Sequence, residues 1–226
     1  MIVAERKPID EIIKMIAKHK SILIVGCETC VAVCFAGGEK EVGVLKSLLK
    51  IQAQKDGKDM QIEGLAIKRQ CDTEFVDELK SKVEGVDAII SLGCGAGVQF
   101  IAERFPEKIV YPGVNTLFIG VTKEQGVWSE RCAACGSCIL EKTGGVCPIA
   151  RCSKSLLNGP CGGSVEGKCE IDPDVDCVWQ IIFDRLKALD RLDLMEEISP
   201  PKDWSTGRDG GPRTVKRDDL REDIDQ

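Results

Sequence analysis

The sequence is poor in histidine and in aromatic residues, and both shortages limit its chemistry. Its 226 residues include one histidine, His19, and ten aromatic residues. A single histidine between Lys18 and Lys20 argues against a histidine general base, a Ser-His pair or a histidine-rich metal site. The net charge is -6, and no basic stripe with interleaved aromatics is present, which argues against nucleic-acid binding. We therefore assign no catalytic residue and no organic-cofactor-binding residue from the sequence.

Long apolar runs are also missing. No 18-residue apolar stretch occurs, and the first 20 residues have neither a continuous apolar segment nor a small-residue cleavage site. These absences predict a cytoplasmic protein without membrane insertion. In a reducing compartment, cysteines serve as metal ligands or redox groups more often than as structural disulfides.

Cysteine, by contrast, is abundant. The chain has 13 cysteines, and eight of them lie between Cys132 and Cys177. Because 13 is odd, at least one thiol is left over in any full pairing. The uneven placement predicts a metal or redox protein.

The first half of the chain alternates strand and helix patterns. Short buried strands are expected at 21–26, 60–67 and 86–92, with amphipathic helices before and between them, and further strands near 109–111 and 116–120. Strands that alternate with helices on short connections form a mainly parallel sheet covered on both faces. Residues 1–123 are therefore predicted to form a doubly wound α/β domain.

The second half of the chain has a different residue pattern. Residues 124–174 form a loop-rich cysteine segment with few periodic apolar residues, which bound metal would cross-link. Residues 175–199 read as an amphipathic C-terminal helix that Pro200 stops. Residues 200–226 are rich in Gly, Asp and Arg and are expected to be extended or disordered, or to wrap a partner.

Five cysteines of the first half follow predicted strands. In doubly wound sheets, ligands gather outside the carboxyl ends of the strands, so all five are expected at one rim. The predicted metal ligands there are Cys27, Cys30 and Cys34, with Cys94 or Cys71 as the fourth.

The spacing in the second half is typical of iron-sulfur proteins. Cys132, Cys135 and Cys138, followed by Cys147-Pro148, resemble the C-x2-C-x2-C...C-P run that holds 4Fe-4S cubanes. The gap before Cys147 is eight residues instead of three, so the ligand pairing stays open. An all-cysteine zinc site is the alternative. The remaining candidates for a fourth ligand and a further cubane are Cys147, Cys152, Cys161, Cys169 and Cys177, the last of which also suits a buried core thiol.

Four segments together resemble a known family. They are GCETCVAVCFAGG (26–38), CAACGSC (132–138), GGVCPIARC (144–152) and LLNGPCGG (156–163). They are similar to the small Cys-rich subunit of methylenetetrahydrofolate reductase from acetogenic and related anaerobic bacteria. The resemblance covers roughly residues 20–180, and the Asn-Gly-Pro-Cys-Gly-Gly stretch is its most specific part.

The resemblance implies a heteromeric oxidoreductase of one-carbon metabolism and the acetyl-CoA pathway. A separate TIM-barrel subunit carrying FMN or FAD would reduce methylenetetrahydrofolate to methyltetrahydrofolate. This chain would be the non-catalytic subunit that brings electrons to that flavin through two or three [4Fe-4S] clusters, from a donor such as ferredoxin or another redox subunit. The alternative is a zinc-stabilised assembly subunit of the same complex. Three cubanes would use twelve cysteines and leave one, Cys71 or Cys177, as an ordinary thiol.

Overall fold

The computed structural model describes residues 1–217 and 219, which fall into two units. The first unit is Met1–Ser129 and the second is Glu130–Gln226. Within the described residues, no helix has the length and apolar character needed to cross a membrane. The helices and strands of the first unit are β1 (Ile2–Arg6), α1 (Ile9–Ile16), β2 (Ser21–Cys27), α2 (Cys30–Val33), α3 (Glu39–Lys55), β3 (Gln61–Ile67), α4 (Thr73–Val76), η1 (Asp77–Leu79), α5 (Lys80–Val83), β4 (Ala88–Ser91), α6 (Gly95–Arg104), β5 (Ile109–Pro112) and β6 (Val114–Glu124), and β7 (Val127–Cys132) crosses the boundary.

A four-stranded parallel sheet forms the centre of the first unit. Its strand order is β3-β2-β4-β5, and the register runs from Ser21 opposite Gln61 to Cys27 opposite Ile67. The chain moves outward from β2 to β3 and then crosses back to β4. The direction of winding therefore reverses between β2 and β4, and doubly wound sheets bind their ligands at such a point.

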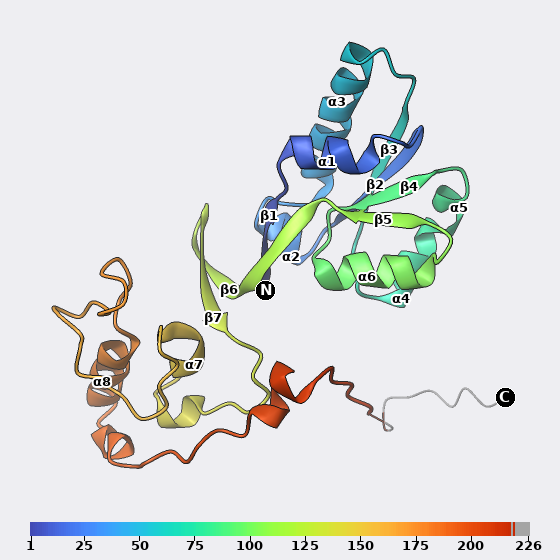
Figure 1. Ribbon diagram of the computed structural model, residues 1–226. Coiled ribbons are helices and arrows are strands. Elements are labelled where there is room, and N and C mark those ends of the chain that lie inside the picture. The colour runs from blue at the N-terminus through green and yellow to red at the C-terminus, as the bar shows by residue number, and fades with distance from the viewer. Residues whose placement is uncertain (218, 220–226) are drawn as a thin grey trace. The chain divides into compact units, whose positions relative to one another are not determined.

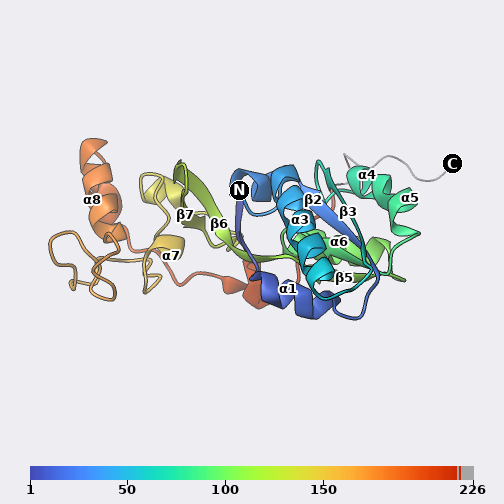
Figure 2. The same ribbon diagram turned by 90° about the horizontal axis from the view of Figure 1, so that it is seen from above.

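Both faces of this sheet are covered by helices (Figures 1 and 2). Alternate residues of β2 point to opposite faces, so Ile22 and Ile24 join a core with α1 and α3, whereas Leu23 and Val25 join a core with α4, α5 and α6. All four side chains are at most 2% exposed. The expected doubly wound α/β fold is confirmed.

A second, antiparallel sheet was not expected. Its order is β1-β6-β7, and β1 pairs with β6 from Ile2 opposite Ile119 to Arg6 opposite Val114. Only Gly113 separates β5 from β6, and a connection that short has no room for the helical crossover that a parallel neighbour needs. The strand expected at 116–120 therefore exists but belongs to a different sheet.

The second unit has few regular elements. They are η2 (Leu140–Lys142), α7 (Pro148–Arg151), α8 (Val178–Ala188), η3 (Leu192–Met195), η4 (Trp204–Thr206) and η5 (Arg208–Gly210). Its main apolar cluster contains five buried residues, four of them on α8. The C-terminal helix is thus shorter than the expected 175–199. It ends before Asp190, whose φ of 55° lies in the left-handed region, which no helix interior adopts.

Candidate metal centres

Three cysteines meet at the rim of the parallel sheet, where the winding reverses. Cys27 is the last residue of β2, Cys71 follows β3, and Cys94 precedes α6. Burial raises the pKa of the Cys71 thiol, and the neighbouring Cys27 and Cys94 raise it further. The Cys71 sulfur is therefore near both other thiols, and the cysteines at or after the ends of three adjacent strands lie at the same rim.

The side chain of Gln70 fixes this arrangement. It is 1% exposed, its Nε2 donates to the carbonyl of Val25 at 2.9 Å, and its Oε1 accepts from the Ser91 hydroxyl at 2.5 Å. A Cβ at Gly93 would lie 2.2 Å from that Oε1, so only glycine permits the close approach. Gln70 thus ties the loop that carries Cys71 to the ends of both β2 and β4.

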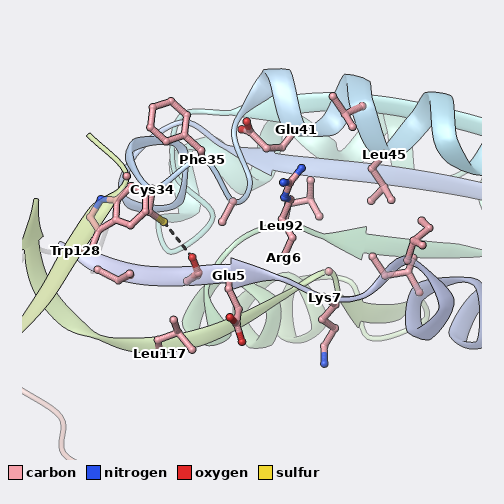
Figure 3. A pocket seen from close by; sticks show the side chains of 18 of the residues that line it. Glu5, Arg6, Lys7, Cys34, Phe35, Glu41, Leu45, Leu92, Leu117 and Trp128 are labelled. Atoms are coloured by element: carbon pink, nitrogen blue, oxygen red, sulfur yellow. Dashed lines mark hydrogen bonds between the residues drawn. The ribbon is translucent and has the colours of Figure 1, made fainter. Parts of the chain in front are cut away.

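Cys34 directs its thiol to β1. Its thiol is 6% exposed and donates to the carbonyls of Ala4 and Val31, both at 3.5 Å (Figure 3). The single turn of α2 carries the chain from the rim back against β1. That all five cysteines share one rim stays a prediction: Cys34 belongs to the same buried cluster as Cys27, against which Cys94 packs, but its thiol is bonded to β1. Cys30, the first residue of α2, is half-buried.

The cavity that Cys34 lines has a volume of about 900 Å³ and mainly apolar walls from β1, α3 and the start of β7. Phe35 and Trp128 lie edge to face across one end, with ring centroids 6.3 Å apart. Of its charged groups, Lys7 pairs with Glu11, and Glu41 accepts from the backbone of Gly38. No sequence pattern predicts this cavity, because two of the strands that form it, β1 and β7, carry no clear strand periodicity.

The Cys132–Cys138 loop holds its sulfurs with backbone hydrogen bonds. The N–H of Ala134 donates to Cys132 Sγ at 3.3 Å, and Ala134 and Gly136 have positive φ values of 51° and 82°. Such N–H···S contacts stabilise thiolates and tune iron-sulfur clusters. The conformation suits a loop that surrounds an anionic centre.

The described part of the C-terminal tail packs on this loop. Lys202 Nζ donates to the carbonyl of Ser137 at 3.0 Å, Thr206 Oγ1 to that of Cys135 at 2.9 Å, and Arg213 Nη1 to that of Ala134 at 3.1 Å. Residues 202–213 are therefore bonded to this chain's own cysteine loop. The rest of the expected 200–226 tail, at 218 and 220–226, lies outside the described residues.

We expect Arg213→Ala to loosen the Cys132–Cys138 loop. Arg213 Nη1 also donates to the Thr206 carbonyl at 2.8 Å, so its loss removes a bridge between loop and tail. Proteolysis within the loop should become about fivefold faster, which corresponds to roughly 1 kcal/mol. Arg208→Ala, an exposed arginine with no described partner, is the matched control; equal rates for the two variants would contradict the bridging role.

Cys147 and Cys152 flank the short helix α7. Cys147 is the N-cap, and its Sγ accepts from the N–H of Ala150 at 3.5 Å; Cys152 is the C-cap. Pro148 at the first helical position has the backbone angle that a helix start requires. The helix start at Cys147-Pro148 therefore places a backbone N–H against the Cys147 sulfur, as the Cys132–Cys138 loop does for Cys132.

Four cysteines surround one small cavity in the second unit. Cys152, Cys161, Cys169 and Cys177 line a space of about 20 Å³ together with Arg151, Trp179 and five other residues. Sequence reasoning had placed the first three among the metal ligands and left Cys177 open as a core thiol. The structure brings all four together.

The thiol of Cys169 is biased toward its charged form. The Ser153 hydroxyl, 3.5 Å from its sulfur, lowers the pKa of Cys169, and the backbone N–H of Ile171 lowers it further. Burial lowers the pKa of the Arg151 guanidinium, and Arg131 adds to this effect. A partly buried cation and a thiol with a lowered pKa thus line the same cavity.

These opposite shifts predict different alkylation profiles in the reduced, metal-free chain. Since the thiolate is the nucleophile, Cys169, with its lowered pKa, should react with iodoacetamide at lower pH than Cys71, with its raised pKa. Mass spectrometry of peptides after timed labelling from pH 6 to pH 10 measures both. Ser153→Ala should move the Cys169 profile to higher pH and leave that of Cys71 in place; a profile that does not move would refute the cause.

Over residues 1–217 and 219, no three His, Cys, Asp or Glu side chains gather closely enough to hold a metal ion as they stand.

The comparison with known families bears on the cysteines of the second unit. Residues 111–205 match a family model described as methylene-tetrahydrofolate reductase C terminal. This stretch contains all eight cysteines from Cys132 to Cys177, and the match supports a relation to methylenetetrahydrofolate reductase. The rim cysteines lie outside it. Neither a curated protein nor a solved structure matches the chain.

Proposed function

We propose that the chain is the iron-sulfur electron-transfer subunit of a heteromeric methylenetetrahydrofolate reductase. The observation that carries the proposal is the presence of eight cysteines inside the stretch that matches the reductase family model. The two N–H···S contacts, at Cys132 and Cys147, add support because iron-sulfur proteins use such contacts. A bound cubane would supply one-electron transfer, and this chain's residues would hold it and set its potential.

The chemistry of the donor set fits such clusters. Thiolates are the usual ligands of iron-sulfur centres, and the eight cysteines of the second unit suffice for two cubanes. Cys132, Cys135, Cys138 and Cys147 would hold one, as their spacing indicates. The cysteines around the small cavity supply the ligands of the other, and the rim of the first unit supplies those of a third.

The division of labour follows from what this chain offers. The charged side chains of the large cavity are engaged with Glu11 and Gly38 or lie exposed on β1, so they form no acid-base pair. A flavin-bearing catalytic subunit would bind the folate and carry out the reduction, and a low-potential donor such as ferredoxin would supply electrons. This chain would connect the two.

Iron and acid-labile sulfide analysis of anaerobically purified full-length chain tests the proposal. A cubane contains about four irons, so two clusters require about eight irons and eight sulfides per chain. Fewer than about four irons per chain after anaerobic reconstitution would refute the electron-transfer role. Reduction with dithionite should produce an EPR signal at low temperature, which zinc cannot give.

A zinc-stabilised assembly subunit is the second candidate. The volume of about 20 Å³ favours it at the four-cysteine cavity, because a single ion needs less room than a cubane. Zinc with four thiolates is a common structural site. Stoichiometric zinc together with absent absorbance near 400 nm would support this candidate and contradict the electron-transfer role.

A further inference from the structure

We infer that Cys177 is a metal ligand and completes a four-thiolate centre with Cys152, Cys161 and Cys169. The sequence placed Cys177 at the start of an amphipathic helix, where a buried core thiol was the simpler interpretation. This assignment deepens the proposed function, but the ligand set is independent of which metal the thiolates hold.

Backbone hydrogen bonds hold Cys177 beside Cys169. The N–H of Cys177 donates to the carbonyl of Gly167 at 2.7 Å, and the N–H of Cys169 donates to that of Val175 at 2.9 Å. Between these bonds, Lys168 and Asp176 form an antiparallel bridge. The two cysteines are therefore placed together by a short two-stranded element, although eight positions separate them.

Side-chain contacts bring the other two cysteines to the same place. The sulfur of Cys169 lies 3.5 Å from the hydroxyl of Ser153, which directly follows Cys152. A Cβ at Gly163, two residues beyond Cys161, would overlap the Glu170 carboxylate, which directly follows Cys169. Cys169 is thus the central member of the group. The segments that carry the other three cysteines all contact the segment that carries Cys169.

Charged side chains of both signs line this group, Glu170 and Asp176 as well as two cations. Arg151 and Lys154 both line the cavity, and Lys154 pairs with Glu170 at its edge. Four thiolates around a divalent ion or a cubane carry net negative charge, which nearby cations stabilise. A plain apolar core would have no use for a partly buried arginine beside four thiols.

The cavity must widen to receive a cubane. About 20 Å³ accommodates one water-sized atom, so the segments that carry the thiols have to move apart. Gly162 and Gly167, with φ values of 81° and 77°, flank the movable loops and tolerate backbone angles that other residues resist. We expect metal binding to reorder residues 159–169 and to leave α8 in place.

Substitution of Cys177 in the full-length chain tests the assignment. Wild type, Cys177→Ala and Cys34→Ala are reconstituted anaerobically with Fe²⁺ and sulfide, and separately with Zn²⁺ alone, and metal per chain is measured. Cys177→Ala should lose about four irons, or one zinc, relative to wild type. Cys34→Ala, which removes a buried thiol bonded to Ala4, should bind as much metal as wild type.

Thiol protection supplies a second measurement that needs no substitution. In the loaded wild-type chain, Cys152, Cys161, Cys169 and Cys177 should resist alkylation and become reactive together when the metal is chelated. If Cys177 reacts independently of the other three, or if Cys177→Ala folds and keeps full metal content, the assignment is wrong. If the wild type binds zinc but no iron, the proposed electron-transfer role fails while the ligand set stands.

A separate observation reassigns the rim of the first unit. We infer that Cys71, together with Cys27 and Cys94, belongs to a second thiolate centre, and that Cys34 does not. The strand order places these three at one reversal point, and Gln70 anchors the Cys71 loop there, whereas the Cys34 thiol is directed to β1. Cys30, three residues after Cys27, is the sequence candidate for the fourth ligand.

The same assay tests the rim. Cys71→Ala should lower metal content by one centre, with Cys34→Ala again unchanged. The opposite pattern, with loss in Cys34→Ala and none in Cys71→Ala, would overturn the reassignment. Together the two inferences divide twelve cysteines into three sets of four and leave Cys34 as the remaining thiol.

Discussion

Chelation of bound metal is expected to destabilise the second unit and leave the stability of the first unit unchanged. The first unit has two apolar clusters, one on each face of its parallel sheet. The second unit has one cluster of five buried residues and long irregular segments. A core of that size offsets only part of the conformational entropy of some 90 residues, whereas binding to structural thiolate sites contributes on the order of 10 kcal/mol.

Hydrogen exchange followed by mass spectrometry measures this difference. Amides of β2 and β4 should keep their protection after anaerobic chelation, while those of α7 and the Lys168–Asp176 bridge should lose it by a factor of at least about 100. The first unit of the same molecule is the internal control. Unchanged protection in the second unit without metal would show that its apolar cluster suffices.

Replacement of Gln70 by alanine should destabilise the first unit by about 3 kcal/mol. The change removes a buried side chain, leaves the Val25 carbonyl with only the Leu92 N–H as donor and the Ser91 hydroxyl without its acceptor, and creates a cavity beside Gly93 and Gly97. Urea denaturation, followed by circular dichroism, measures the free energy of unfolding.

The matched control is Gln54→Ala, an exposed glutamine on α3, which should cost less than about 0.5 kcal/mol. Gln70→Ala should also free the loop that carries Cys71, so that alkylation of Cys71 becomes faster in the native state. A Gln70 variant as stable as the Gln54 variant would mean that the two hydrogen bonds do not hold the rim.

The elements that the sequence predicted well are those with strong apolar periodicity. The strand at 21–26 and an amphipathic helix expected between it and the next strand appear as β2 and α3, because their apolar residues follow the periods of strand and helix. The convergence of Cys27, Cys71 and Cys94 followed from the general rule about strand ends. The local pattern and the tertiary environment agree at these positions.

The parts that the sequence did not predict depend on contacts between distant segments. β1 is five residues long and is a strand because it pairs with β6, more than 100 residues later. The direction of the Cys34 thiol depends on that same strand. Gln70 belongs to no sequence motif. Its partner Val25 lies 45 residues before it, and its partner Ser91 lies 21 residues after it. No periodicity in the sequence reports such pairings.

The tail contacts described for the second unit have a consequence for chain entropy. Hydrogen bonds from Lys202 to Ser137 and from Thr206 to Cys135 join two points of the chain and enclose the intervening segment, which contains the four-cysteine cavity, in a closed loop. Closing a loop costs entropy that grows only slowly, by ~0.6 kcal/mol for each doubling of length. Because the ends of this segment are already joined, it has fewer accessible conformations than an open chain. Bringing its four thiols to one metal therefore costs less conformational entropy.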